Sequence, residues 1–314
     1  MILKPFEPYE LTTGLNALKN RLPANHPKYQ EIVEDLGRQE AGDMGEEHVM
    51  SVLGAAELPK DTLVFHNISF YSKVDIQIDV LIVSPNWCLV MEVKNWTGAL
   101  YFNDKPSQVI CEKDGRERIY TNPESQLDSY CYGLNEFFRN HEIKIPIYGI
   151  IVFPFNNAAI KKPPVKFPIA VGRQYLKYLW TLPVDEKNNY SPPSAIANKL
   201  LQNNKTLSVS PLIEKYGIAP SEILAGVQCP SCGTFPMKRT LRTWYCPKCR
   251  QNNMYAHENA LNDYSLLINK LITSQEALRF LNLRNRHEAK RMVQANSKLK
   301  IGTTKSSKYE LEFK

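Results

Sequence analysis

Long apolar runs are missing from this sequence of 314 residues. None approaches the roughly 18 consecutive apolar residues that a membrane-spanning helix requires. The start of the chain, residues 1–7, also lacks the basic segment and the long apolar stretch of a secretion signal. We therefore expect a cytoplasmic protein without a membrane partner.

The sequence also lacks the motifs of several enzyme classes. It has no glycine-rich phosphate loop followed by Lys and Ser or Thr, and it has no GxSxG segment. Its six histidines include no HExxH pair. Nucleotide hydrolases, serine esterases and zinc metalloproteases of these types are therefore not indicated.

The sequence has seven cysteines, and four of them fall into two CxxC pairs separated by thirteen residues. Two residues between paired thiolates let a tight turn present both sulfurs to one ion, and four thiolates complete the tetrahedral shell of Zn²⁺. We therefore predict a small ribbon over about residues 226–255, in which zinc has a structural role. A pair of redox motifs is the alternative, but no thioredoxin-like βαβ pattern surrounds either pair. The zinc ligands would be Cys229, Cys232, Cys246 and Cys249.

Two acidic residues stand near the ends of apolar segments. Residues 76–83 and 87–94 are rich in branched apolar side chains and flank a short turn, which predicts a hairpin of two buried strands. Because side chains alternate along a strand, Glu92 and Lys94 point the same way, and a suitable register brings Asp79 beside them. Two carboxylates and an ammonium group would then converge.

Such a cluster suits phosphodiester hydrolysis. Carboxylates are the hard oxygen ligands that Mg²⁺ prefers, and a bound Mg²⁺ or Mn²⁺ would activate water and polarise the phosphoryl oxygen. We expect Asp79 and Glu92 to hold this metal. Lys94, with a depressed pKa, would orient or deprotonate the attacking water. The alternative is a structural salt bridge among the three residues.

The N-terminal half of the chain resembles the nuclease-related domain, NERD, a branch of the PD-(D/E)xK nuclease superfamily. The similarity spans roughly residues 35–155 and rests on segments 41–46, 78–83, 91–98 and 122–126. It implies an α/β (α+β) fold with a restriction-endonuclease-like mixed sheet flanked by helices. It also implies a catalytic centre in which Glu46 reaches the other residues from a helix. The implied residues of this centre are Glu46, Asp79, Glu92, Lys94 and Gln126.

The resemblance indicates a metal-dependent nuclease that acts on nucleic acid, DNA in particular. Some folds of this superfamily only bind nucleic acid, because a fold does not by itself fix an activity. The alternative is therefore a non-catalytic DNA-binding protein that keeps the nuclease fold as a scaffold.

Apolar periodicity predicts the elements of this N-terminal part. An antiparallel hairpin together with a later strand that must cross over would make the sheet mixed. We expect a NERD domain over residues 1–204, and then a linker and the ribbon over 205–255. The expected helices cover residues 12–24, 27–54, 124–140 and 193–203, and the other expected strands cover 62–70, 147–153, 174–181 and weaker segments within 98–120.

Charge is distributed unevenly along the chain. Residues 205–314 hold 18 Lys or Arg against 8 Asp or Glu, whereas residues 1–204 hold 21 against 24. A basic segment beside a candidate nuclease suggests attraction to the phosphate backbone. An ordinary solvated surface is the alternative.

Residues 256–314 have the outline of a winged helix-turn-helix. Thr273 and Glu276 fit a capping box that opens a short helix, Asn285 can cap a third helix, and a glycine at 302 predicts the tip of a hairpin. A helical appendage used only for protein contacts is the alternative. The third helix would present to nucleic acid a basic face made of Arg286, His287, Lys290 and Arg291.

Overall fold

The computed structural model describes residues 1–314 except 186, 206–207, 305 and 313–314. Contacts within the chain divide it into two compact units, each made of two segments. The sheet unit consists of Met1–Pro8 and Glu40–Leu207, and the ribbon unit consists of Tyr9–Gln39 and Ser208–Lys314. No helix among the described residues is long and apolar enough to cross a membrane.

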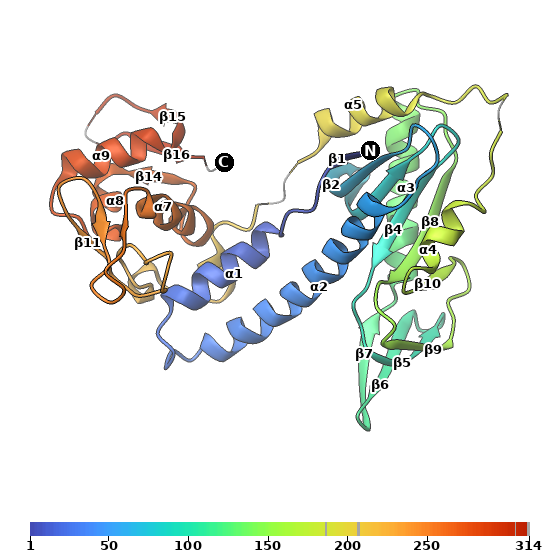
Figure 1. Ribbon diagram of the computed structural model, residues 1–314, viewed down its shortest axis with the longest axis horizontal. Coiled ribbons are helices and arrows are strands. Elements are labelled where there is room, and N and C mark those ends of the chain that lie inside the picture. The colour runs from blue at the N-terminus through green and yellow to red at the C-terminus, as the bar shows by residue number, and fades with distance from the viewer. Residues whose placement is uncertain (186, 206–207, 305, 313–314) are drawn as a thin grey trace. The chain divides into compact units, whose positions relative to one another are not determined.

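The sheet unit is built on a central sheet with the strand order β1-β2-β3-β4-β8-β10 (Figure 1). β2, β3 and β4 form two antiparallel pairs, whereas β8 lies parallel to β4 and β10 lies parallel to β8. The sheet is therefore mixed, as predicted. In the order of their labels, its strands are Ile2–Lys4, Leu63–Ser72, Val74–Val83, Cys88–Val93, Ile147–Phe153 and Ile169–Val171.

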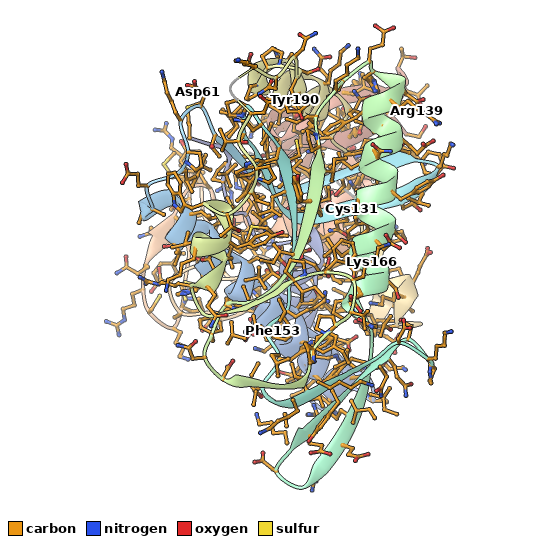
Figure 2. The ribbon with its side chains drawn as sticks, turned by 90° about the vertical axis from the view of Figure 1, so that its right-hand side faces the viewer. Asp61, Cys131, Arg139, Phe153, Lys166 and Tyr190 are labelled. Atoms are coloured by element: carbon orange, nitrogen blue, oxygen red, sulfur yellow. The ribbon has the colours of Figure 1, made fainter. Side chains whose placement is uncertain are left out.

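Helices cover both faces of the central sheet. α3 (Pro123–Asn140) and α5 (Pro193–Asn203) pack on one face, which we call the α3 face. The C-terminal part of α2 (Tyr29–Ala55) and helix α4 pack on the other, which we call the α2 face. Figure 2 shows Cys131 and Arg139 along α3, where it runs beside the strands. Burial on both faces explains why the central strands are almost continuously apolar.

One predicted strand is wrong, because residues 174–181 hold the helix α4 (Gln174–Leu179). Tyr175 and Leu179 lie four residues apart and are both buried on the α2 face, as helical spacing requires. Gly172, with a φ of +62°, ends the short strand before the helix. In so short a segment, an aromatic and apolar composition does not separate the two periodicities.

A second sheet, with the order β7-β6-β5-β9, is formed by segments that lie in the chain between β4 and β10 of the central sheet. Figure 2 shows it beyond the end of β8, where Phe153 lies. Gly98 begins β5 with a φ of +113°, and a Cβ atom there would lie 2.4 Å from the carbonyl oxygen of Glu112. Only glycine therefore fits this close approach. The strands β5, β6, β7 and β9 are Gly98–Asn103, Gln108–Lys113, Arg116–Thr121 and Ala158–Lys162.

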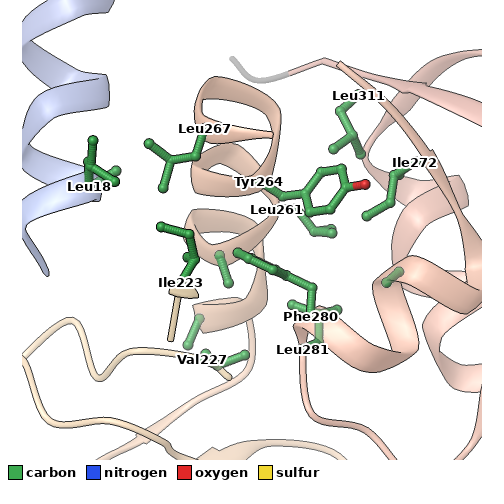
Figure 3. Packing of buried hydrophobic residues seen from close by; sticks show 14 of the residues in the cluster. Leu18, Ile223, Val227, Leu261, Tyr264, Leu267, Ile272, Phe280, Leu281 and Leu311 are labelled. Atoms are coloured by element: carbon green, nitrogen blue, oxygen red, sulfur yellow. The ribbon is translucent and has the colours of Figure 1, made fainter. Parts of the chain in front are cut away.

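The ribbon unit has its own apolar core (Figure 3). Leu18 of the first helix lies beside Leu267, and Phe280 contacts Tyr264 with ring centroids 5.1 Å apart. The predicted domain boundaries stay a prediction, but residues 9–39, expected in the N-terminal domain, group with the C-terminal residues. The short elements ahead of the tail are α1 (Glu10–Arg21), α6 (Leu212–Lys215), η1 (Pro220–Glu222), β11 (Lys238–Arg239), β12 (Trp244–Tyr245) and β13 (Asn252–Asn253).

A buried arginine joins α1 to the rest of this unit. Arg21 is fully buried, and its Nε donates to Asp263 at 2.7 Å. Its Nη1 donates to the carbonyl oxygens of Leu224 and Gly226. The guanidinium also lies 4.6 Å from the ring centroid of Phe280. A charge so deep in a core is tolerated because it is paired and hydrogen-bonded.

The tail has the predicted helix-turn-helix outline followed by a hairpin. Thr273 and Glu276 form the capping box, and Asn285 accepts from the backbone N–H of His287 to cap α9. Asn282 turns the chain between the two helices with a φ of +53°. In the predicted hairpin over 301–311, Lys305 lies outside the described residues. The tail elements are α7 (Ala256–Leu267), β14 (Leu271–Thr273), α8 (Ser274–Phe280), α9 (Arg286–Ala295), β15 (Ser297–Ile301) and β16 (Lys308–Leu311).

Candidate functional site

The register of β3 and β4 brings the two predicted carboxylates together. Val80 pairs with Met91 at the end of the ladder between these strands, so Asp79 and Glu92 are the next residue on each strand. Oδ2 of Asp79 accepts the backbone N–H of Val93 at 2.8 Å. This bond ties the first acid to the strand that carries the second.

Side-chain alternation along β3 breaks at Asp79. Ile78 packs into the core under the α3 face, whereas Val80 packs into the core under the α2 face, and Leu81 returns to the α3 face. On the neighbouring strand, Asn67 has a φ of +48° at the same level. Asp79 lies at this break, and its charge raises the pKa of Glu92 on the next strand. Irregularities of this kind re-aim side chains next to functional sites.

Lys94 lies directly after β4, and its side chain contacts one of the two acids. Its Nζ forms an ion pair with Oε1 of Glu92, and its backbone N–H donates to Val152 at 2.8 Å. The side chain of Glu92 is fully buried, and neither of its oxygens accepts a hydrogen bond of normal geometry from the described residues. The structure thus brings Asp79, Glu92 and Lys94 into one cluster.

Glu46 approaches this cluster from α2. Its Oε2 lies 2.9 Å from Nε2 of His66, and its charge contributes to the electrostatic field at Lys94. The preceding residue, Gly45, allows the helix to come close, because a Cβ atom there would meet Asn95 at 3.2 Å. Sequence reasoning missed His66, and no spacing in the chain links it to Glu46.

Gln126 lies on the first turns of α3. Its Nε2 donates to the hydroxyl of Tyr130 at 3.0 Å. Burial raises the pKa of Tyr130, and the charges of Glu92 and Asp79 raise it further. Tyr130 therefore lies within electrostatic reach of the acids, and it was also missed. Its position four residues after Gln126, on the same helical face, was the available signal.

Burial governs the protonation of the cluster. It raises the pKa of Glu92 to about 8, and the charge of Asp79 adds to this effect. Burial lowers the pKa of Lys94, but the carboxylates of Glu92, Asp79 and Glu46 together outweigh it, so the net shift is upward. The expectation of a depressed pKa for Lys94 is therefore wrong, because acids surround the ammonium group. Lys94 is a cation at neutral pH.

The donor set fits a hard divalent cation. Asp79 and Glu92 carry carboxylate groups close enough for the charge of one to raise the pKa of the other, and Lys94 is the ion-pair partner of Glu92. Mg²⁺ is usually bound through one or two carboxylates and keeps several waters. Among the described residues, no third acid or histidine lies close enough to Asp79 and Glu92 for the three to form a group of potential metal ligands. The site would therefore need water or phosphate oxygens to complete a coordination shell.

The four predicted cysteines form a site that can hold zinc. Their sulfurs all lie within 4.8 Å of one another. Cys229 and Cys249 have sulfurs 3.6 Å apart, and those of Cys232 and Cys246 are 3.5 Å apart. Tetrahedral zinc with bonds of about 2.3 Å separates its sulfurs by roughly 3.8 Å, so this spacing fits.

The predicted basic face of α9 borders a polar pocket in the ribbon unit. Arg286, His287 and Lys290 line a cavity of about 300 Å³ together with the hydroxyl groups of Ser274 and Ser307, among others. Nε of Arg286 donates to the hydroxyl of Ser274 at 3.2 Å. Arg291 is exposed on the same helix but does not line the cavity.

The sheet unit is thus a mixed sheet with helices on both faces, and it carries the cluster of two acids and a lysine on its strands β3 and β4 and directly after them. Residues 41–154 match the family model described as the nuclease-related domain, NERD. This match confirms the resemblance found in the sequence. Comparisons with curated proteins and with solved structures give no match. The catalytic roles of the individual residues stay predictions.

Proposed function

We propose that this protein is a metal-dependent nuclease that hydrolyses phosphodiester bonds of DNA. The observation that supports it most is the placement of Asp79 beside the buried carboxylate of Glu92, which is paired with Lys94. A bound Mg²⁺ or Mn²⁺ would supply an activated water and polarise the phosphoryl oxygen. A nuclease-related domain over residues 41–154 agrees with this function.

Each side chain of the cluster would have a separate task. Asp79 and Glu92 would bind the divalent cation through their oxygens. Lys94 is cationic, which suits it to neutralise the charge that builds up on the phosphoryl oxygens. Glu46 would assist coordination, and Gln126 would orient a water molecule or a phosphate oxygen. Tyr130 would hold Gln126 in place through its hydroxyl group.

The ribbon unit would dock the substrate. It carries the basic excess of the chain, and Arg286, His287 and Lys290 converge on one polar pocket. Such a surface attracts phosphates without reading sequence. With Arg286→Ala and Lys290→Ala combined, DNA binding should weaken and its salt dependence should flatten. The control pair is Arg242→Ala with Lys248→Ala, which removes two exposed cations from the ribbon. An unchanged salt slope would refute the docking role.

Cleavage assays test the nuclease activity. Zinc-loaded protein should cut one or more of a panel of single- and double-stranded DNA and RNA only when Mg²⁺ or Mn²⁺ is added. Asp79→Asn, Glu92→Gln and Lys94→Ala should each lower the rate by about 100-fold or more, because the charge stabilisation involved amounts to several kcal/mol. Glu57→Gln and Lys60→Ala, exposed residues of the same unit, serve as matched controls and should keep the rate.

A DNA-binding protein without catalytic activity is the second candidate. Lys94 forms an ion pair with Glu92, and its pKa is raised. Both observations are unfavourable to a nuclease in which this lysine acts as a base, and to that extent they favour the second candidate. This candidate predicts that the protein binds duplex DNA but does not cleave it, whichever divalent metal is added. The nuclease predicts that Glu92→Gln abolishes cleavage but leaves binding largely intact.

A further inference from the structure

A polar cavity of about 550 Å³ adjoins the candidate catalytic lysine within the sheet unit. Its lining begins at Asn95, the residue that follows Lys94, and continues through Trp96 and Thr97. Nδ2 of Asn95 donates to the carbonyl oxygen of Ala41 at 2.8 Å, which fixes this loop to α2. The cavity therefore lies one residue from the cluster on a loop that is held in place.

The far wall of the cavity is one face of the second sheet, on which cations gather. In the register of β6 and β7, Lys113 pairs with Arg116 and Cys111 pairs with Arg118, so these side chains share a face. Glu112 pairs with Glu117 and falls on the opposite face. Alternation has thus sorted the strand charges by sign.

The three cations of this face are exposed, and none of them forms an ion pair with a described residue. One acid, Asp114, also lines the cavity, at the turn between the strands. The wall therefore keeps a net positive charge that internal pairing does not cancel. Such a wall attracts a polyanion. The cations are Lys113, Arg116 and Arg118.

Aromatic rings complete the lining. Trp96 and Tyr120 are stacked, with ring centroids 4.4 Å apart and planes 16° from parallel. Trp96 is braced in turn against Phe153, whose ring centroid lies 6.1 Å away. Both stacked rings are half-buried, and both line the cavity. A braced aromatic pair offers a surface on which a base can stack.

We propose that this cavity binds a single-stranded segment of nucleic acid next to the bond that is cut, with Arg116 and Arg118 on backbone phosphates and a base against Trp96 and Tyr120. A cationic groove with aromatic platforms is how proteins hold single strands. In a duplex the base faces are already stacked on neighbouring bases, so a paired strand cannot use the platform. The inference rests on the proposed function for the position of the scissile bond.

Binding of a labelled single-stranded oligonucleotide to the full, zinc-loaded chain in magnesium-free buffer tests this inference. Fluorescence anisotropy should show that Arg116→Glu with Arg118→Glu weakens binding by about tenfold or more, and that the salt slope falls by roughly 0.7 for each phosphate that is no longer neutralised. Arg173→Glu with Lys177→Glu makes the same change of charge on α4, outside the cavity, and should have little effect. If charge reversal impairs folding, Arg116→Gln with Arg118→Gln replaces it.

Tryptophan fluorescence gives a second readout. The oligonucleotide should quench the emission of the wild type and of Trp180→Phe, which removes an exposed tryptophan elsewhere in the unit, but should quench Trp96→Phe much less. A duplex of the same sequence should bind without this quenching. Equal effects of the cavity and α4 variants, or equal quenching by a duplex, would overturn the inference.

The outcomes separate this inference from the proposed function. If no metal supports cleavage but the cavity variants still bind more weakly than the wild type, binding at the cavity is supported and the nuclease activity is refuted. If the wild type cuts DNA and the cavity variants bind and cut as well as it does, the nuclease activity is supported and binding at the cavity is refuted.

Discussion

Glu92 is a carboxyl group fully buried in a sheet, and its ion-pair partner is the ammonium group of Lys94. Burial and the charge of Asp79 disfavour the charged form more than Lys94 favours it, which is why the pKa of Glu92 rises to about 8. A carboxylate that burial destabilises gains from a cation that neutralises its charge. Strained or unsatisfied groups of this kind gather at functional sites.

The raised pKa of Glu92 predicts how stability depends on pH. The folded state keeps a proton that the unfolded chain releases above about pH 4.5, so the contribution of Glu92 to stability falls as pH rises from about 4.5 to about 8. Across this window, the wild type should lose stability relative to Glu92→Gln, by at most about 1.4 kcal/mol per pH unit. Urea unfolding of both proteins in magnesium-free buffer at several pH values measures the difference. A constant difference would show that the carboxyl group titrates normally.

His66 should act by positioning Glu46. Burial lowers the pKa of His66 to about 4, so the ring is neutral at pH 7. Nδ1 lies 3.4 Å from the backbone N–H of Glu7 and accepts from it, which leaves Nε2–H to donate to Glu46. In His66→Ala, we expect cleavage to need about tenfold more Mg²⁺.

Gln at position 66 keeps a side-chain donor and should restore much of the Mg²⁺ affinity. A merely structural role for His66 would lower the amount of folded protein without changing the Mg²⁺ concentration at half-maximal rate. That outcome would refute the positioning role.

At this scale the sequence exposed part of the site. Asp79, Glu92 and Lys94 follow from spacing and alternation, because the register of a short hairpin is nearly determined by its turn. The break in alternation at Asp79 could not be predicted from the alternating pattern, and it coincides with the positive φ of Asn67 on the neighbouring strand. His66 was hidden for a similar reason, because its contact with Glu46 arises only in the tertiary fold.

Among the elements, those with strong local signals were predicted well. Buried strands and amphipathic helices of ten or more residues carry their period in the sequence, and capping residues set the starts of the tail helices. The six-residue helix α4 was mistaken for a strand because it is too short to show its period. The grouping of residues 9–39 with the C-terminal segment could not be seen either, because it depends on long-range contacts such as Arg21 with Asp263.

The two CxxC turns of the ribbon have the same backbone geometry, and one of them contains a strained residue. In each, the residue after the second cysteine bonds back to the first cysteine: the N–H of Gly233 to the oxygen of Cys229, and that of Arg250 to the oxygen of Cys246. Both residues have positive φ, +70° and +60°. Glycine adopts this conformation freely, whereas arginine is strained there.

Arg250→Gly should therefore stabilise the ribbon unit by about 1 kcal/mol, since the exposed side chain has no ion-pair partner among the described residues. Gly233→Ala at the equivalent position should destabilise it by a similar amount. Thermal unfolding of the zinc-loaded proteins measures both changes. A loss of stability in Arg250→Gly would show that its side chain, and not backbone strain, dominates.

At the scale of the whole molecule, the four-cysteine site that could hold zinc is part of the ribbon unit's core and not an appendage to it. Cys229 and Cys246 belong to the same buried cluster as Leu18 of α1 and Leu261 of α7. The sheet unit has separate cores on the two faces of its sheet. Loss of zinc should therefore spread through one unit and spare the other.

Cys246→Ser should abolish zinc binding and lower hydrogen-exchange protection in α1 and α7, while β2, β3 and β4 keep theirs. Cys131→Ser, which changes a half-buried thiol on α3, is the control and should leave α1 and α7 protected. An equal drop in protection in both units of Cys246→Ser would contradict the division of the chain.

The central claim is that Asp79 and Glu92 together bind a divalent cation beside Lys94. Titration of the zinc-loaded chain with Mn²⁺, followed by electron paramagnetic resonance, tests it most directly. The account predicts one bound Mn²⁺ per chain in the wild type and in Glu57→Gln, and none at the same concentration in Glu92→Gln. Absence of binding in the wild type, or equal binding in Glu92→Gln, would contradict it.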